Sequence, residues 1–176
     1  MAATFIVETG EGLINANAYI TIAEADQIIE NYGDSQDWSS AEDEEKENAI
    51  REASRYVDLR YKFQGFKSNW DQALEFPRIE VYDFGGIQQD YNVVPEKLKQ
   101  ACAYLALKVI EGNILLDDLD GGTDATIQSQ SSSIGPISES ITYRDGAPPN
   151  KSYQIANKLL EQYTAFRGGA SEILRG

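Results

Sequence analysis

The densest group of side chains that could bind a metal is a run of carboxylates from Asp117 to Asp124. Calcium loops of the EF-hand kind need acids at positions 1, 3 and 5, glycine at position 6 and glutamate at position 12. Counted from Asp118, the fifth residue is Gly122 and the twelfth is Ser129, so the spacing fails. We therefore predict a solvated acidic turn here, with no metal site and no cofactor.

The other groups that could support catalysis fail similar tests. The chain has no histidine, which excludes Ser-His-Asp and Cys-His catalysis and histidine-containing zinc sites. The single cysteine, Cys102, lies on an apolar helical stripe, where a small buried side chain is expected. The segment Gly10-Glu11-Gly12 resembles the start of a dinucleotide-binding GxGxxG motif but lacks the third glycine, and no P-loop is present. These observations predict that the protein is not an enzyme.

Residues 51–78 interleave basic and aromatic side chains, and proteins hold single-stranded nucleic acid with such a combination. Glu47 and Glu52 can pair with the arginines on the same helix, and the aromatic rings could equally cover a helical core. Binding of single-stranded DNA by a replication or recombination accessory protein is therefore the alternative hypothesis. Its candidate contacts are Arg51, Arg55, Arg60, Lys62, Lys67 and Trp70.

The overall charge disfavours nucleic acid and anionic membranes as partners. The chain has 15 Lys and Arg against 29 Asp and Glu, a formal net charge of −14 with a pI near 4.3. Nucleic-acid affinity comes largely from phosphate neutralisation by basic side chains.

The first five residues do not resemble a signal peptide, and no apolar run reaches the ~20 residues of a membrane helix. We expect a soluble protein made in a reducing compartment.

Capping signals and apolar periodicity predict four helices in the 176 residues. The first begins with the capping box of Thr21 and Glu24 and ends at Tyr32-Gly33. The second begins at Ser39 or Ser40 and runs to about Tyr61. A third follows Pro95 and ends at Gly112-Asn113, and the last spans Tyr153 to Tyr163.

The segments between these helices have turn and strand signals. Residues 62–94 alternate aromatic and turn residues, with a short hairpin predicted at Gly85-Gly86. Residues 125–144 are predicted to form a polar β-hairpin or extended arm, and Gly168-Gly169 opens a loose tail. The predicted fold is mainly α: one domain over 1–176, a small bundle of about four helices with a projecting β-hairpin or extended arm and a flexible C-terminal tail. The parts are a helical core at about 20–115 and 149–166, the arm at about 125–144 and the tail at 167–176.

The order of several motifs resembles a tailed-bacteriophage family. These are Thr9 to Tyr19 (TGEGLINANAY), Ala53 to Tyr61 (ASRYVDLRY), Gln72 to Arg78 (QALEFPR), Val94-Pro95 and Gly135-Pro136-Ile137. The family is that of head–tail connector proteins, also called adaptor or head-completion proteins, whose members often carry the label of DnaT-like single-stranded-DNA-binding proteins. The resemblance covers about residues 8–165. Ala18 stands where the family more often has Ser, and Phe76 where Trp is common.

The resemblance implies a structural virion protein without catalysis. Such adaptors are small helical bundles with projecting β-arms, assembled as a homo-oligomeric ring beneath the portal, often twelvefold. The implied partners are the portal protein, the tail or nozzle and tail-completion proteins, and further copies of the chain. Genomic DNA would pass through the channel without specific binding, and an acidic channel wall would repel its phosphates. The implied location is the neck of the virion, after synthesis in the host bacterial cytoplasm.

Two segments are the candidates for assembly contacts. The mildly basic last helix and tail could dock on an acidic portal surface with apolar anchors, or could be a frayed terminus. The candidate portal or subunit docking residues are Lys151, Lys158, Phe166, Arg167, Ile173, Leu174 and Arg175. An isolated two-stranded hairpin is marginally stable, so the arm would gain from a neighbouring subunit. The candidate inter-subunit arm residues are Ile127, Ile134, Pro136, Ile137, Ile141 and Tyr143.

Overall fold

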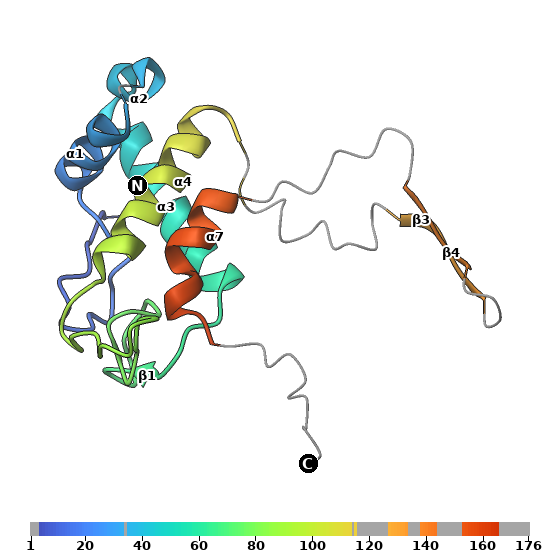
Figure 1. Cartoon of the computed structure of the whole chain (residues 1–176). Coiled ribbons are helices and arrows are strands. Elements are labelled where there is room, and N and C mark those ends of the chain that lie inside the picture. Colours follow the sequence, from blue (N-terminus) through green and yellow to red (C-terminus); the bar gives the residue numbers. More distant parts are fainter. Residues whose placement is uncertain are drawn as a thin grey trace, which may run out of the picture.

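A computed structural model of the chain describes residues 4–33, 35–113, 115, 127–133, 138–143 and 153–165. In these ranges the protein is mainly helical, as predicted (Figure 1). The helices are α1 (Ile22–Tyr32), α2 (Gln36–Ser40), α3 (Asp43–Arg60), α4 (Glu96–Ile110), α7 (Gln154–Leu160) and the short 3₁₀ helix η1 (Glu161–Tyr163). The strands are β1 (Phe66–Lys67), β2 (Arg78–Ile79), β3 (Ile127–Ser133) and β4 (Ser138–Tyr143).

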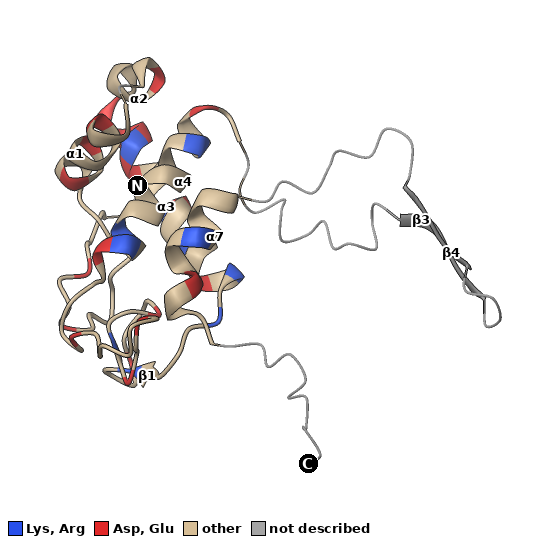
Figure 2. Ribbon diagram, in the orientation of Figure 1, with Lys and Arg blue, Asp and Glu red and all other residues tan. Residues whose placement is uncertain are grey.

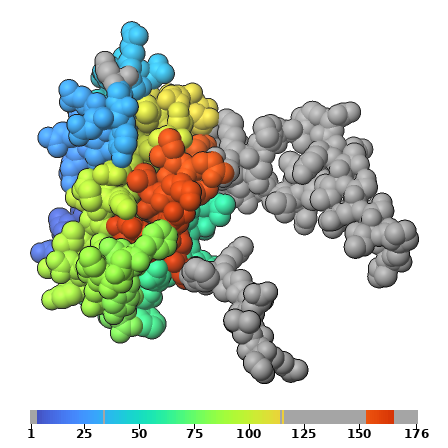
Figure 3. Space-filling view, in the orientation of Figure 1, coloured from blue at the N-terminus to red at the C-terminus, as the bar shows by residue number. Residues whose placement is uncertain are grey.

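The helices form a bundle around α4. Helices α1, α3 and α7 all pack against α4, and the space-filling view shows α7 lying directly against it (Figure 3). The interior is built from the apolar stripes that the sequence predicts, including Ile50 and Val57 of α3, Leu98 and Leu105 of α4, and Leu160 of α7. These side chains are fully buried, so most of the driving force for folding comes from removing this helical interface from water.

The predicted helix starts are confirmed at α1 and α4 and wrong at α3. Thr21 and Glu24 form the capping box, and Pro95 occupies the N-cap of α4. Ser39 and Ser40 do not begin the second long helix, because they belong to the separate short helix α2. The side chain of Trp38 in α2 is buried and donates a 2.7 Å hydrogen bond to Asp26, which fixes this turn against α1. Helix α3 therefore starts later, with Glu42 as its N-cap.

Residues 62–94 form a set of loops at the end of the bundle where Figure 1 labels β1. Strands β1 and β2 pair antiparallel, with Phe66 opposite Ile79. The hairpin predicted at Gly85-Gly86 is present in a short form, as a bridge between Tyr82 and Gln88 and a 3.0 Å hydrogen bond from the amide of Asp83 to the carbonyl of Ile87. Strand pairing covers only a few residues of this segment, so individual long-range contacts hold most of it in place.

The hairpin predicted for 125–144 is also confirmed. Strand β3 pairs antiparallel with β4, and the register runs from Ile127 opposite Tyr143 to Ser133 opposite Ser138. The predicted Gly135-Pro136 bend and the tail at 167–176 lie outside the described residues.

Gly65 allows a close approach of two chain segments in the loop set. It has φ +63°, and a Cβ atom there would lie 1.9 Å from the carbonyl oxygen of Ile79. Gly86 has a similar φ of +76°, but a Cβ atom there would meet nothing within 4 Å. The two glycines therefore share the backbone requirement and differ in the space around them.

We predict that Gly65→Ala destabilises the protein more than Gly86→Ala. Both substitutions carry the cost of a left-handed backbone, about 1–2 kcal/mol. Gly65→Ala adds a collision with main-chain atoms, which costs about 1–3 kcal/mol more. Urea unfolding of the two variants measures the difference, and equal losses would show that the approach of Gly65 to Ile79 is not a tight contact.

Candidate functional site

A buried hydrogen-bonded junction positions the loop set on the bundle. The hydroxyl of Tyr19 donates to the carboxylate of Asp58 on α3, and the backbone amide of Phe76 donates to the same hydroxyl at 3.1 Å. The second oxygen of Asp58 accepts from the amide of Glu75 at 3.2 Å. Burial raises the pKa of Asp58 to about 7, although the hydrogen bonds from Tyr19 and from the amide of Glu75 lower it.

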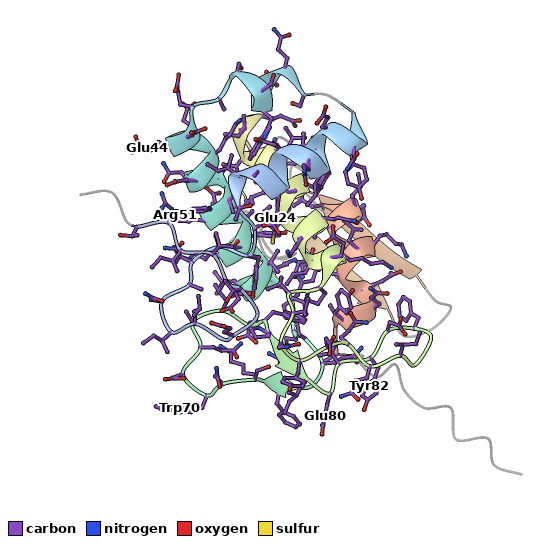
Figure 4. All side chains as sticks on the ribbon, turned by 90° about the vertical axis from the view of Figure 1, so that its left-hand side faces the viewer. Glu24, Glu44, Arg51, Trp70, Glu80 and Tyr82 are labelled. Atoms are coloured by element: carbon purple, nitrogen blue, oxygen red, sulfur yellow. The ribbon has the colours of Figure 1, made fainter. Side chains whose placement is uncertain are left out.

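The loops held by this junction expose large apolar side chains. We call this set the end surface: Phe66, Trp70, Ile79, Tyr82, Ile87, Tyr91 and Val93, all exposed. Trp70 is 93% exposed, and Figure 4 places it with Glu80 and Tyr82 at the same end of the molecule. Phe66 and Ile79 are partners across β1 and β2, and the hydroxyl of Ser68 donates to the carbonyl of Tyr91 at 2.8 Å. Several exposed apolar side chains at one end of a molecule make that end a candidate interaction site.

The charges among these loops are mainly negative or neutralised. Residues 62–94 contain three basic and five acidic residues. Arg78 is buried, and its guanidinium donates to the carbonyls of Gln64 and Gly65 and to the carboxylate of Glu75. Lys67 pairs with the same carboxylate at 3.2 Å. Two of the three cations therefore serve the local structure.

The six predicted nucleic-acid contacts do not converge on one surface. Arg51 pairs with Glu47 on α3 and lies over the ring of Phe5, and Arg55 is exposed on the same helix. Figure 4 shows Arg51 halfway along the molecule and Trp70 at its end, and in Figure 2 acidic and basic residues are mixed along the ribbon. Lys67 is engaged by Glu75.

The remaining two predicted contacts, Arg60 and Lys62, lie together in a groove, which we call the basic groove. Its volume is about 710 Å³, and it is lined by Leu59, Arg60, Tyr61, Lys62, Phe84, Glu161, Thr164 and Ala165. The guanidinium of Arg60 lies 5.8 Å from the centre of the Tyr61 ring, and the amide of Ala165 donates to the carbonyl of Lys62 at 2.7 Å. The exposed ring of Phe84 also lines the groove. The groove therefore combines two cations with two aromatic rings, the combination found in single-strand binding sites.

Sequence analysis missed Phe84 as a member of this groove. The residue lies next to the Gly85-Gly86 turn, 22 positions after Lys62, and only the fold brings the two together. Its sequence signal is an aromatic side chain at the tip of a predicted hairpin, where no core position is expected.

The glycines of the incomplete GxGxxG motif bind a carboxylate of the chain itself. The buried side chain of Glu8 accepts hydrogen bonds from the amides of Gly10, Gly12 and Leu13 at 2.8–2.9 Å. Amides arranged in this way form an anion-binding nest in phosphate-binding loops. Here Glu8 satisfies them, so the motif has a structural role.

The predicted assembly residues are described only in part. Lys158 is exposed on α7 and pairs with Glu161 at 2.8 Å. Ile127, Ile141 and Tyr143 are strand positions of the hairpin. The other candidates lie outside the described residues: Ile134, Pro136, Ile137, Lys151, Phe166, Arg167, Ile173, Leu174 and Arg175.

The described residues offer neither a metal site nor a membrane span. Among them no group of three or more metal-binding side chains occurs, and the run from Asp117 to Asp124 lies outside them. None of the described helices is both long enough and apolar enough to cross a bilayer. Cys102 is fully buried, and burial raises the pKa of its thiol, which opposes reactivity.

The raised pKa of Asp58 leads us to predict that the stability of the protein depends on pH. Because its pKa is higher in the folded protein than in the unfolded chain, the folded protein binds the extra proton between about pH 4 and pH 7. Through this group, stability rises as the pH falls from 7 towards 4, by at most about 1.4 kcal/mol per unit. We expect Asp58→Asn to lose that slope in urea unfolding from pH 8 to pH 5. Asp71→Asn, an exposed control, should keep it, and an unchanged slope in Asp58→Asn would contradict the assignment.

The comparisons with known proteins give one match. A family model described as "Putative DnaT-like ssDNA binding protein" matches residues 3–176. No curated protein and no solved structure matches the chain.

Proposed function

Because the chain belongs to this DnaT-like family, we propose that it acts by binding and assembly and is not an enzyme. The function that we propose is that of a phage head–tail adaptor, a structural virion protein. Its copies form a ring that joins the portal to the tail proteins in the neck of the particle. The observation that carries this proposal is the end surface, which exposes several large apolar side chains on a chain of net charge −14.

The chemistry of the end surface supports contact with protein. Aromatic and aliphatic side chains such as Phe66, Trp70 and Tyr91 are the residue types that anchor protein interfaces. The surrounding loops have more acids than bases, and their cations Lys67 and Arg78 are paired. A site for a DNA strand would instead need unpaired cations along the strand's path.

The net charge supports the same proposal. DNA passing through a ring should slide without sticking, and carboxylates on the channel wall repel its phosphates. The excess of 14 acidic over basic residues gives the chain enough carboxylates for such a wall. The resemblance of its motifs to head–tail adaptors supplies the portal and tail proteins as the proposed partners.

The second candidate function is binding of single-stranded DNA, and the family's description favours it over the adaptor. The specific observation is the basic groove, where Arg60 and Lys62 lie with the rings of Tyr61 and Phe84. These are also two of the six contacts that the sequence predicts. However, Glu161 contributes a carboxylate to the lining of this groove.

The two candidates make opposite predictions for two matched double variants. Phe66→Asp with Tyr91→Asp alters only exposed positions of the end surface, and Arg60→Glu with Lys62→Glu reverses the charge of the basic groove. We expect the end-surface variant to fold and to reduce the yield of completed particles at least about tenfold, because a charge in an apolar contact is costly to bury. The groove variant should complete particles normally.

The measurement is complementation of a phage that lacks its own copy of the gene, with electron microscopy of the particles. Normal completion with the end-surface variant would contradict the adaptor function. Tight binding of a labelled ~30-nucleotide strand at low salt, lost in the groove variant, would establish the second candidate instead.

A further inference from the structure

An apolar groove runs between α1, α4 and α7, on a different part of the bundle from the end surface and the basic groove. Its cavity of about 270 Å³ is lined by Ile28, Tyr32, Tyr104, Leu107, Ile155 and Leu159, among others. Tyr32 and Ile155 are more than half exposed, although they flank an apolar cavity. A cavity of this size is slightly smaller than usual small-molecule pockets, and it suits one or two aliphatic side chains of a peptide.

We propose that the groove binds the C-terminal segment of the same chain, with Ile173 and Leu174 as the side chains that enter it. The last described residue is Ala165, so 11 residues follow the bundle. Fully extended, they span at most about 36–40 Å. The occupant is therefore already tethered next to its site, which favours it over any partner free in solution.

The lengths agree with a chain that reverses and runs back along α7. From Ile155 to Tyr163 the last six residues of α7 and the three of η1 cover about 15 Å, and Thr164 and Ala165 add about 7 Å. The nine residues 166–174 span at most about 30–32 Å when extended, so a chain that reverses after Ala165 has the length to bring Leu174 to the level of Ile155.

One charge pair also agrees with this direction. Glu172 precedes the apolar pair. Along the groove, exposed Lys158 lies on α7 directly before the lining residue Leu159 and nearer to Ala165 than Ile155 is. The returning segment therefore brings Glu172 towards Lys158.

Disulfide trapping in the full-length chain tests the proposal. We pair Leu174→Cys with Ile155→Cys in the groove and, as a control, with Leu59→Cys, which lines the basic groove together with Ala165. Ile155 is 53% exposed and Leu59 is 59% exposed, so the two positions are similarly accessible. Leu59 lines the same groove as Ala165, the residue after which the tail begins. A tail without a binding site would therefore react with the Leu59 position at least as fast. Native Cys102 is fully buried and does not compete.

We expect the groove pair to form an intramolecular disulfide at least about tenfold faster than the control pair, at a rate independent of protein concentration. Adding Ile173→Asp should reduce that rate to the control level, whereas Ser171→Asp should leave it unchanged. Equal rates for the two pairs would overturn the proposal. Disulfide-linked dimers whose formation accelerates with concentration would also overturn it, because the occupant would then be the tail of a second copy. None of these outcomes depends on the proposed adaptor function.

Discussion

The partly buried carboxylate of Asp58 is the constraint on which the arrangement of the molecule depends. It joins three parts of the chain: the N-terminal segment through the hydroxyl of Tyr19, helix α3 on which it lies, and the loop set through the amide of Glu75. Removing an ionised acid from water is costly, and the hydrogen bonds from Tyr19 and from the amide of Glu75 offset part of that cost. The loops that display the end surface are therefore fixed to the bundle by polar contacts inside an apolar core.

Local signals were sufficient to predict where α1 and α4 begin. The Thr21–Glu24 box and Pro95 act within one helical turn, and the structure keeps both. The start of α3 could not be chosen in the same way, since Ser39 and Ser40 are the residue type preferred at an N-cap and Glu42, the N-cap in the structure, is not. The choice depends on the burial of Trp38 and its hydrogen bond to Asp26, a contact with another helix.

The candidate surfaces were harder to predict than the helices because they are assembled from distant residues. The basic groove needs Phe84 beside Lys62, and the end surface needs the close approach of Gly65 to Ile79. The sequence grouped Arg51 to Trp70 as one nucleic-acid region from their order along the chain. In the structure the pairing of Arg51 with Glu47 and of Lys67 with Glu75 separates that group into structural cations and the smaller pair Arg60 and Lys62.

The central claim is that the apolar end surface, and not the basic groove, makes the functional contact. The most direct measurement is sedimentation velocity of the chain mixed with both its portal protein and a labelled ~30-nucleotide single strand at low salt, the condition most favourable to DNA binding. The account predicts that the chain sediments with the portal while the label stays free. Sedimentation of the label with the chain, while the portal sediments alone, would contradict it.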